Sequence, residues 1–150
     1  MSGGRVTLAG CTPQPWRNGG GLTRELIVWP GPSDWQLRVS VADVGADGPF
    51  SPFPGIDRWF AVVDGPGVVL ALTDGDHELQ RGQAPLRFAG EAAPHCRLVA
   101  GPTRDLNLMV RRGGGAATMH LAAPGSAVQG TTRWRALFAA EAARLGCDGV

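Results

Sequence analysis

The sequence predicts one small all-β domain, a barrel that holds a ligand without a metal ion. Three observations indicate this: many short apolar runs between turn residues, a glycine-rich stretch that leads into an arginine-bearing strand, and a lack of metal-ligand motifs. The chain has 150 residues, which suits a single domain with its own core. Its 23 glycines and 12 prolines are spread along the chain and punctuate it as turns do.

The apolar runs have the short length and even spacing that are typical of β-sandwiches and β-barrels. Strict alternation is clearest in residues 35–44, as expected for a strand whose successive side chains point to opposite faces. One face of that strand carries Trp35, Leu37, Val39 and Val41, and the other carries Gln36, Arg38, Ser40 and Ala42. Strands are predicted at residues 5–9, 22–29, 35–44, 58–63, 68–73, 86–89, 97–100, 105–111 and 118–122.

A single helix is predicted over residues 132–145, where apolar residues recur at helical spacing. Thr131 or Thr132 can cap its start, and Gly146 can end it. Two related β halves are an open alternative to a single barrel, because the strand groups at 22–63 and 86–122 both end in polar turns.

The net charge of +1 argues against a nucleic-acid-binding surface. The chain has no lysine, so any anion site must use arginine, whose planar fork suits carboxylates. The cysteines Cys11, Cys96 and Cys147 are far apart and form no CxxC pair, which indicates a reducing compartment. With no visible signal peptide and no apolar run of membrane-spanning length, we expect a cytoplasmic protein.

Motifs for metals, cofactors and nucleophiles do not fit. The three histidines His77, His95 and His120 form no His-x-His pair, so no metal site is expected. No Gly-x-Ser-x-Gly elbow is present, and a dyad of Cys11 with a distant histidine is only an open alternative. The three glycines at 19–21 lack the Lys-Ser/Thr and the helix of a phosphate loop. We therefore predict no cofactor and assign no catalytic residue.

Two arginines lie in apolar strands, which is unusual because an unpaired buried guanidinium is costly. Arg24 alternates with Leu22, Leu26 and Val28 on the face expected to point inward, and Arg58 shares a face with Phe60 and Val62. Each needs either an internal carboxylate or an anionic ligand, and the sequence leaves both alternatives open. The internal candidates are Glu25, Asp43, Asp57 and Asp105.

Four segments, in order, resemble the HutD/Ves family. Residues 15–25 read PWRNGGGLTRE and residues 35–42 read WQLRVSVA. Residues 47–58 read DGPFSPFPGIDR, and residues 101–112 read GPTRDLNLMVRR. The resemblance covers roughly residues 10–112, and residues 113–150 depart from the family pattern as a divergent tail.

The resemblance implies a cupin-like barrel with two β halves, a bicupin whose second half is incomplete here. It also implies a regulatory role in histidine utilisation, through binding of a carboxylate metabolite such as formylglutamate or urocanate. Arg58 is the first choice for anchoring that carboxylate. The remaining expected ligand-binding residues are Trp16, Asn18, Arg24, Glu25, Arg38, Ser40, Asp57 and Asn107.

Two other functions remain open. A metal-free enzyme would use Glu25 or Asp57 as a general base on a small acid. A protein-interaction module would use exposed residues among Trp29, Trp35 and Trp59 together with the final helix. The tail would dock on the barrel or mediate contacts in a homodimer. No nucleic-acid or membrane partner is expected.

Overall fold

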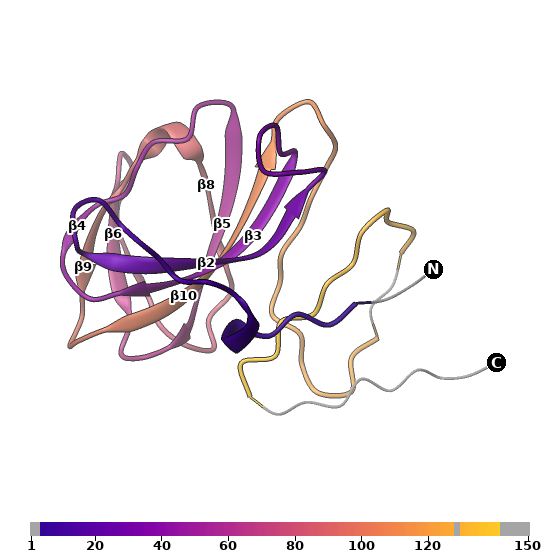
Figure 1. Cartoon of the computed structure of the whole chain (residues 1–150). Helices are drawn as coiled ribbons and strands as arrows, with labels where there is room; N and C mark the ends of the chain where they lie inside the picture. The colour runs from indigo at the N-terminus through magenta and orange to yellow at the C-terminus, as the bar shows by residue number, and fades with distance from the viewer. Residues whose placement is uncertain (1–3, 128–129, 142–150) are drawn as a thin grey trace.

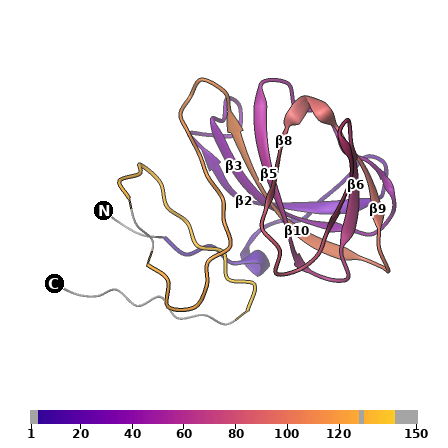
Figure 2. The same cartoon turned by 180° about the vertical axis from the view of Figure 1, so that it is seen from behind.

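The computed structural model describes residues 4–127 and 130–141, and two antiparallel sheets face each other in it as a barrel (Figures 1 and 2). The strands are β1 (Gln14–Pro15), β2 (Gly21–Trp29), β3 (Leu37–Val44), β4 (Gly48–Pro49), β5 (Ile56–Asp64), β6 (Val68–Leu72), β7 (Gly75–Leu79), β8 (Leu86–Ala89), β9 (His95–Leu98) and β10 (Thr103–Arg111). Two short 3-10 turns, η1 (Leu8–Gly10) and η2 (Gly90–Ala92), complete the described elements.

The larger sheet has the order β1-β2-β3-β10-β5-β8, and the smaller has the order β4-β9-β6-β7. The strand β10 therefore lies between β3 and β5, although it is the last strand in the sequence. Each inner side chain of β10 thus has one neighbour on β3 and one on β5, because directly opposed residues share a face. This placement brings three distant segments together on one wall of the barrel.

The core lies between the two sheets. Phe60 and Val62 from β5 pack there against Val68 and Leu70 from β6 and Cys96 from β9. Burial of these side chains from both sheets identifies the face of β5 that carries Phe60 as the inner face. Because Phe60 is opposite Asn107, and Asn107 is opposite Ser40, the inner face can be followed across the larger sheet.

Most of the predicted strands are present. The strand at 86–89 matches β8, and those at 22–29, 35–44, 58–63, 68–73, 97–100 and 105–111 overlap β2, β3, β5, β6, β9 and β10. The prediction missed β7 because its residues are mostly polar, although Asp74-Gly75 is a frequent hairpin turn. The two-residue strands β1 and β4 are too short to leave a periodic pattern.

Four expectations about the chain ends and surface are wrong for the described residues. Residues 5–9 form no strand but lead into η1, and residues 118–122 are irregular. The helix predicted at 132–145 is not formed in its described part, 132–141; residues 142–145 lie outside the described residues. A short amphipathic helix needs a packed apolar face, and here Trp134 stays 54 % exposed and Leu137 46 %. None of Trp29, Trp35 and Trp59 is exposed.

The described residues also form one barrel rather than two β halves. Because β10 is inserted between β3 and β5, the later strands complete the same sheet as the earlier ones. The second half expected from the resemblance has no counterpart among the residues that the structure describes.

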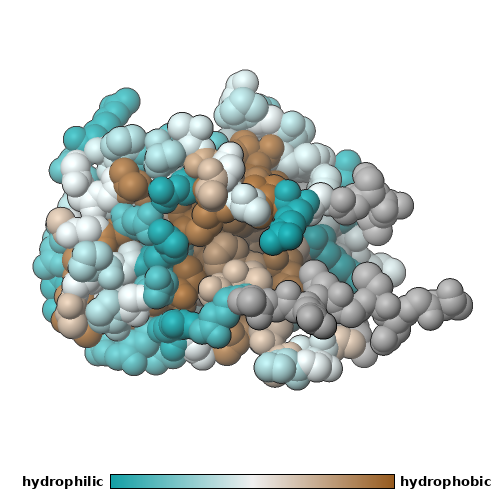
Figure 3. All heavy atoms as spheres, turned by 60° about the horizontal axis from the view of Figure 1, so that its bottom comes forward, coloured by the Kyte–Doolittle hydropathy of each residue, from teal (hydrophilic) through white to brown (hydrophobic). Residues whose placement is uncertain are grey.

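The tail begins at the end of β10 and lies beside the barrel near the N-terminal segment (Figures 1 and 2). Trp134 of the tail contacts Trp29 of β2, with ring centroids 5.8 Å apart, and the Arg133 guanidinium lies 4.6 Å from the Trp29 ring centroid. In Figure 3, apolar residues gather in the middle of one face of the molecule, with hydrophilic residues around them. No helix among the described residues is both long and apolar enough to cross a membrane.

Candidate functional site

The inner face of the larger sheet carries a cluster of polar side chains in the middle of an otherwise apolar barrel. Its centre is Arg58 on β5, which is only 4 % exposed. Arg58 is opposite Met109 on β10, and Met109 is opposite Arg38 on β3. With neighbouring strands about 4.8 Å apart, the backbones of the two arginines are about 10 Å apart on one wall. The two positive charges therefore act on the same interior space.

The guanidinium of Arg58 is only partly satisfied. Its Nη2 donates a hydrogen bond to Asn107 Oδ1 over 2.9 Å. Its Nε and Nη1 are buried and have no hydrogen-bond partner among the described residues. Burial lowers the pKa of Arg58 to about 10, and the nearby Arg38 adds to that effect, yet the group remains charged at neutral pH. A buried cation with two free donor nitrogens is the most unusual polar group in this barrel.

Three aromatic rings surround the Arg58 guanidinium. Its carbon lies 5.1 Å from the ring centroid of Phe88, 5.4 Å from that of Phe53 and 5.5 Å from that of Phe50. Such contacts between a cation and ring faces stabilise a desolvated guanidinium. The rings also exclude water, so the site is closed in this conformation. Two surface pockets, of about 220 and 260 Å³, lie elsewhere, against the tail.

A chain of hydrogen bonds links Arg58 to the carboxyl group of Asp105 on β10. Asn107 Nδ2 donates to Asp105 Oδ1, while Asp105 Oδ2 has no partner among the described residues. Burial raises the pKa of Asp105 to about 8 despite the opposing effect of Arg58. Of the four internal carboxylates considered from the sequence, Asp105 is thus linked to Arg58, but through the side chain of Asn107 and not by direct contact.

The second arginine of this wall has a direct partner. Arg38 Nη2 lies 3.1 Å from Glu25 Oε1 on β2, and its Nε is buried without a partner among the described residues. Ser40 is buried between Glu25 and Asn107 in the register of the sheet. Five of the predicted residues therefore share the inner wall: Glu25, Arg38, Ser40, Arg58 and Asn107.

The glycine-rich stretch places Trp16 at the edge of this wall. Trp16 Nε1 donates to Thr23 Oγ1 over 2.7 Å, and its ring meets Phe50 edge to face at 6.0 Å. A side chain at Gly21 would collide with the Asp43 carbonyl oxygen at 2.5 Å, so glycine permits this close approach. Trp16 thus contacts Phe50, one of the rings around Arg58. Asn18 accepts a hydrogen bond from the Gly20 amide and serves the turn.

The prediction that Arg24 points inward is wrong. Arg24 is opposite Val41, on the outer face, and pairs with Asp43 at 2.7 Å. The register of β2 shifts at a β-bulge between Glu25 and Ile27. Odd-numbered residues point inward before this bulge, whereas the even-numbered Val28 points inward after it. Strict alternation of inner and outer residues therefore does not hold along the whole strand. A prediction that continues the alternation through Leu26 places Arg24 on the wrong face.

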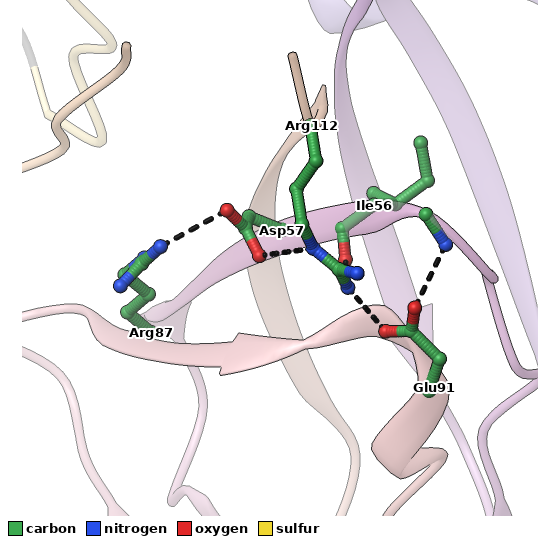
Figure 4. Close-up of polar contacts among 6 residues, drawn as sticks. Ile56, Asp57, Arg87, Glu91 and Arg112 are labelled. Atoms are coloured by element: carbon green, nitrogen blue, oxygen red, sulfur yellow. Dashed lines mark hydrogen bonds and ion pairs between the residues drawn. The ribbon is translucent and has the colours of Figure 1, made fainter.

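Asp57 also lies away from the interior, in an ion-pair network on the outer surface (Figure 4). Its carboxylate accepts hydrogen bonds from Arg87 at 2.9 Å and from Arg112 at 3.0 Å, and these hold its pKa below the usual range. Arg112 also donates to Glu91, which in turn accepts from the Gly55 amide at 2.8 Å. This network fastens the segment that precedes β5 to η2.

Sequence reasoning missed the aromatic ring set, and it offered Asp105 only as one of four internal carboxylates, without relating it to Asn107. Phe50, Phe53 and Phe88 lie on three separate segments, so nothing in their spacing relates them. Asp105 and Asn107, by contrast, are two residues apart in an apolar strand. That spacing puts both on one face, so it could have identified a polar pair inside the barrel.

A metal is not indicated by this geometry. No group of three or more His, Cys, Asp or Glu side chains arranged to hold a metal ion occurs in residues 4–127 and 130–141. The two carboxyl groups of the inner wall are tied to protein groups, Glu25 to Arg38 and Asp105 to Asn107.

Comparisons with known proteins agree with the sequence motifs. The profile of the family described as HutD matches residues 9–147. Protein Ves of Citrobacter koseri is 39 % identical over 100 residues, which is 65 % of this chain and 52 % of that protein. The chain spans about half the length of the curated relatives it matches.

Solved structures agree with the same fold. HutD from Pseudomonas fluorescens SBW25 superimposes with a TM-score of 0.67 at 35 % identity, covering 71 % of this chain and 59 % of that one. A sugar phosphate isomerase of the cupin superfamily from Silicibacter pomeroyi gives a TM-score of 0.51 at 19 % identity, covering 72 % and 76 % of the two chains. The second likeness concerns the fold alone, which is cupin-like.

Proposed function

This chain belongs to the HutD family, and we propose that it binds a small carboxylate metabolite inside its barrel, held by Arg58 without a metal ion. The observation that carries the proposal is the buried guanidinium whose Nε and Nη1 have no partner among the described residues. Leaving such a group unsatisfied is costly, whereas a carboxylate oxygen can accept a charge-assisted hydrogen bond from either free nitrogen.

The charges on the inner wall also favour an anion. Glu25 balances Arg38, with which it pairs directly. Burial raises the pKa of Asp105 to about 8, so at pH 7 and below the group is largely protonated and leaves the charge of Arg58 uncompensated. The wall then carries a net positive charge in a dry, apolar space, where attraction to an anion is strong.

The surrounding rings favour a ligand with a small apolar or flat body. Phe50 and Phe53 come from the segment before β5, while Phe88 is part of β8. We propose that a ligand enters when Phe50 or Phe53 moves aside, since β8 is fixed by its pairing with β5. The rings then close on the ligand and exclude water.

The ligand candidates are formylglutamate and urocanate, with the regulatory role in histidine utilisation that the family resemblance implies. The HutD relative from Pseudomonas fluorescens was determined in a formate condition. Formate is the smallest carboxylate, so it tests the arginine contact without requiring a fit to the rest of the site.

The proposal is tested by thermal unfolding with formate, formylglutamate and urocanate at millimolar concentration. A ligand at 100 times its dissociation constant adds about 2.7 kcal/mol to the free energy of unfolding, so the melting temperature should rise clearly. Arg58→Ala should remove the rise. Arg24→Ala is the matched control, because Arg24 pairs with Asp43 on the outer face, and it should keep the rise.

Two results would count against binding at this site. If none of the three acids raises the melting temperature of the wild type, the carboxylate proposal fails. If Arg58→Ala and Arg24→Ala both keep the rise, the ligand binds elsewhere.

A metal-free enzyme is the second candidate function, and one observation favours it. Asp105 is a fully buried carboxyl group with a raised pKa near Arg58, which is the setting of many general acids and bases. Asp57 does not fit that role, because it lies in the outer network with a lowered pKa. Conversion of formylglutamate or urocanate, lost in Asp105→Asn, would support an enzyme; unchanged acid after long incubation with concentrated protein would argue against it.

A further inference from the structure

Three buried side chains form a continuous chain on the inner wall. Arg58 donates to the Asn107 amide oxygen, and the Asn107 amide nitrogen donates to Asp105. The exposed fractions of the three residues are 4 %, 5 % and 0 %, respectively. Both ends of the chain have free polar atoms among the described residues: Nε and Nη1 on Arg58, and Oδ2 on Asp105. The two charges are therefore held apart by one amide rather than joined as an ion pair.

Burial, opposed by Arg58 and by the hydrogen bond from Asn107, raises the pKa of Asp105 to about 8, which lies closer to neutral pH than the pKa of Arg58 at about 10. Arg58 on β5 favours the ionised form of Asp105, and the more distant Asp43 on β3 opposes it. Cys96 on β9 faces it from the smaller sheet, and burial raises the pKa of that thiol to about 12. Arg38 lowers the pKa of Arg58, and Asp47 raises the pKa of Cys96. His95, next to Cys96, is exposed.

We propose that Asp105 is a further specificity-determining residue of this site, which competes with the bound carboxylate for the charge of Arg58; the inference rests on the proposed function. When Asp105 is neutral, Arg58 is an unbalanced cation and holds the ligand. When Asp105 is ionised, its own negative charge balances Arg58 and repels the ligand. Asn107 keeps Asp105 within electrostatic range but prevents direct contact.

Thermodynamic linkage between anion binding and proton binding determines how the affinity changes with pH. A bound anion disfavours the ionised form of Asp105, so binding above neutral pH is accompanied by uptake of a proton. Affinity should therefore be constant at low pH and fall as the pH rises through the titration of Asp105. The steepest fall that one proton permits is about tenfold per pH unit.

The test is a titration of the ¹⁵N-labelled full chain with sodium formate between pH 6 and 9 at constant ionic strength, followed by NMR. Formate stays ionised over this range, so only the protein changes its charge. Wild-type affinity should be flat near pH 6 and fall above about pH 7.5. Asp105→Asn should bind formate with an affinity that does not fall between pH 6 and 9. Asp76→Asn is the matched control and should keep the wild-type profile, because Asp76 on β7 forms an exposed ion pair with Arg97 on β9.

A second measurement needs no variant. Calorimetric titration of the wild type with formate at pH 8, in two buffers of different ionisation enthalpy, should show uptake of a fraction of a proton per formate bound. The same titration at pH 6 should show none.

The outcomes separate the two proposals. Formate binding that does not depend on pH, a pH-dependent fall that persists in Asp105→Asn, or the absence of proton uptake at pH 8 would each overturn the role of Asp105 and leave the binding function standing. Absence of formate binding at every pH would overturn both.

Discussion

The proposed binding function depends on Arg58, because this residue is both buried and incompletely paired. Contacts with three rings offset part of the loss of water, at roughly 0.5–2 kcal/mol each. One hydrogen bond to Asn107 satisfies a single nitrogen. A purely structural arginine would be expected to use its remaining donors on carbonyl groups or carboxylates, as Arg112 does with Asp57, Glu91 and Ile56.

The charge state of Asp105 should be visible in the stability of the folded protein. Its pKa is about 8 in the folded state against 3.8 as the ordinary value, so between these pH values the folded protein holds a proton that the unfolded chain has lost. Its contribution to stability therefore falls as pH rises from about 4 to about 8. Asp105→Asn should gain stability relative to the wild type over this range, by at most about 1.4 kcal/mol per pH unit.

Urea unfolding of both proteins at pH 5, 6, 7 and 8 measures this difference. Carboxylates with lowered pKa values, such as Asp43 and Asp57, lose their contribution only at lower pH and are common to both proteins. Parallel stability curves for the two proteins would show that Asp105 is ionised throughout.

At the scale of elements, the segment between β4 and β5 covers Arg58 with aromatic rings. It carries Phe53, and hydrogen bonds hold it at three points: the Phe50 amide on the Pro94 carbonyl, the Phe53 amide on the Gly90 carbonyl, and the Gly55 amide on Glu91. Gly90 lets η2 approach closely, since a side chain there would meet the Phe53 carbonyl oxygen at 2.3 Å. The segment is thus anchored by contacts that can open without unpairing the long strands.

Glu91→Gln should loosen this segment. The substitution removes the charge that Arg112 and the Gly55 amide share, so hydrogen exchange should speed up in residues 50–56 with little change in β10. Global stability should fall by no more than about 1 kcal/mol, because exposed ion pairs contribute little. Glu78→Gln on the exposed strand β7 is the control. Unchanged exchange in residues 50–56 would mean that Glu91 does not hold the segment.

The elements also show which features the sequence could predict. Apolar runs and turn residues located seven strands because each run is flanked by glycine, proline or aspartate. The orientation of Arg24 could not be predicted, because a bulge after Glu25 changes which positions face inward. For β3 the more apolar face, with Val39 and Val41, lies outside and the face with Arg38 and Ser40 lies inside. Hydrophobicity alone therefore gives the wrong inner face in this sheet.

The candidate site was predictable to the extent that it follows local motifs. Arg58, Asn107, Arg38, Ser40 and Glu25 were expected, and they share one wall because β10 lies between β3 and β5. That strand order is a long-range property that no short segment specifies. For the same reason Asp57, adjacent to Arg58 in sequence, was expected in the site but lies on the opposite face of β5. Neighbours in a strand point to opposite sides.

At the scale of the whole molecule, the barrel has a cupin-like fold with an arginine-centred interior. We predict that its stability does not depend on a metal ion. Extensive dialysis against EDTA should leave the melting temperature unchanged, and zinc, nickel or iron(II) at tenfold excess should not raise it, because a ligand stabilises only the state that binds it. A rise with one metal that is lost in a single histidine or carboxylate variant would reveal a site and contradict this prediction.

The most direct test of carboxylate binding at Arg58 is a high-resolution crystal structure of the full chain grown with sodium formate. We predict a formate with an oxygen within hydrogen-bond distance of Nε or Nη1 of Arg58, enclosed by Phe50, Phe53 and Phe88. An interior without formate, in which Asp105 itself contacts the Arg58 guanidinium, would show a buried ion pair and contradict carboxylate binding at this site.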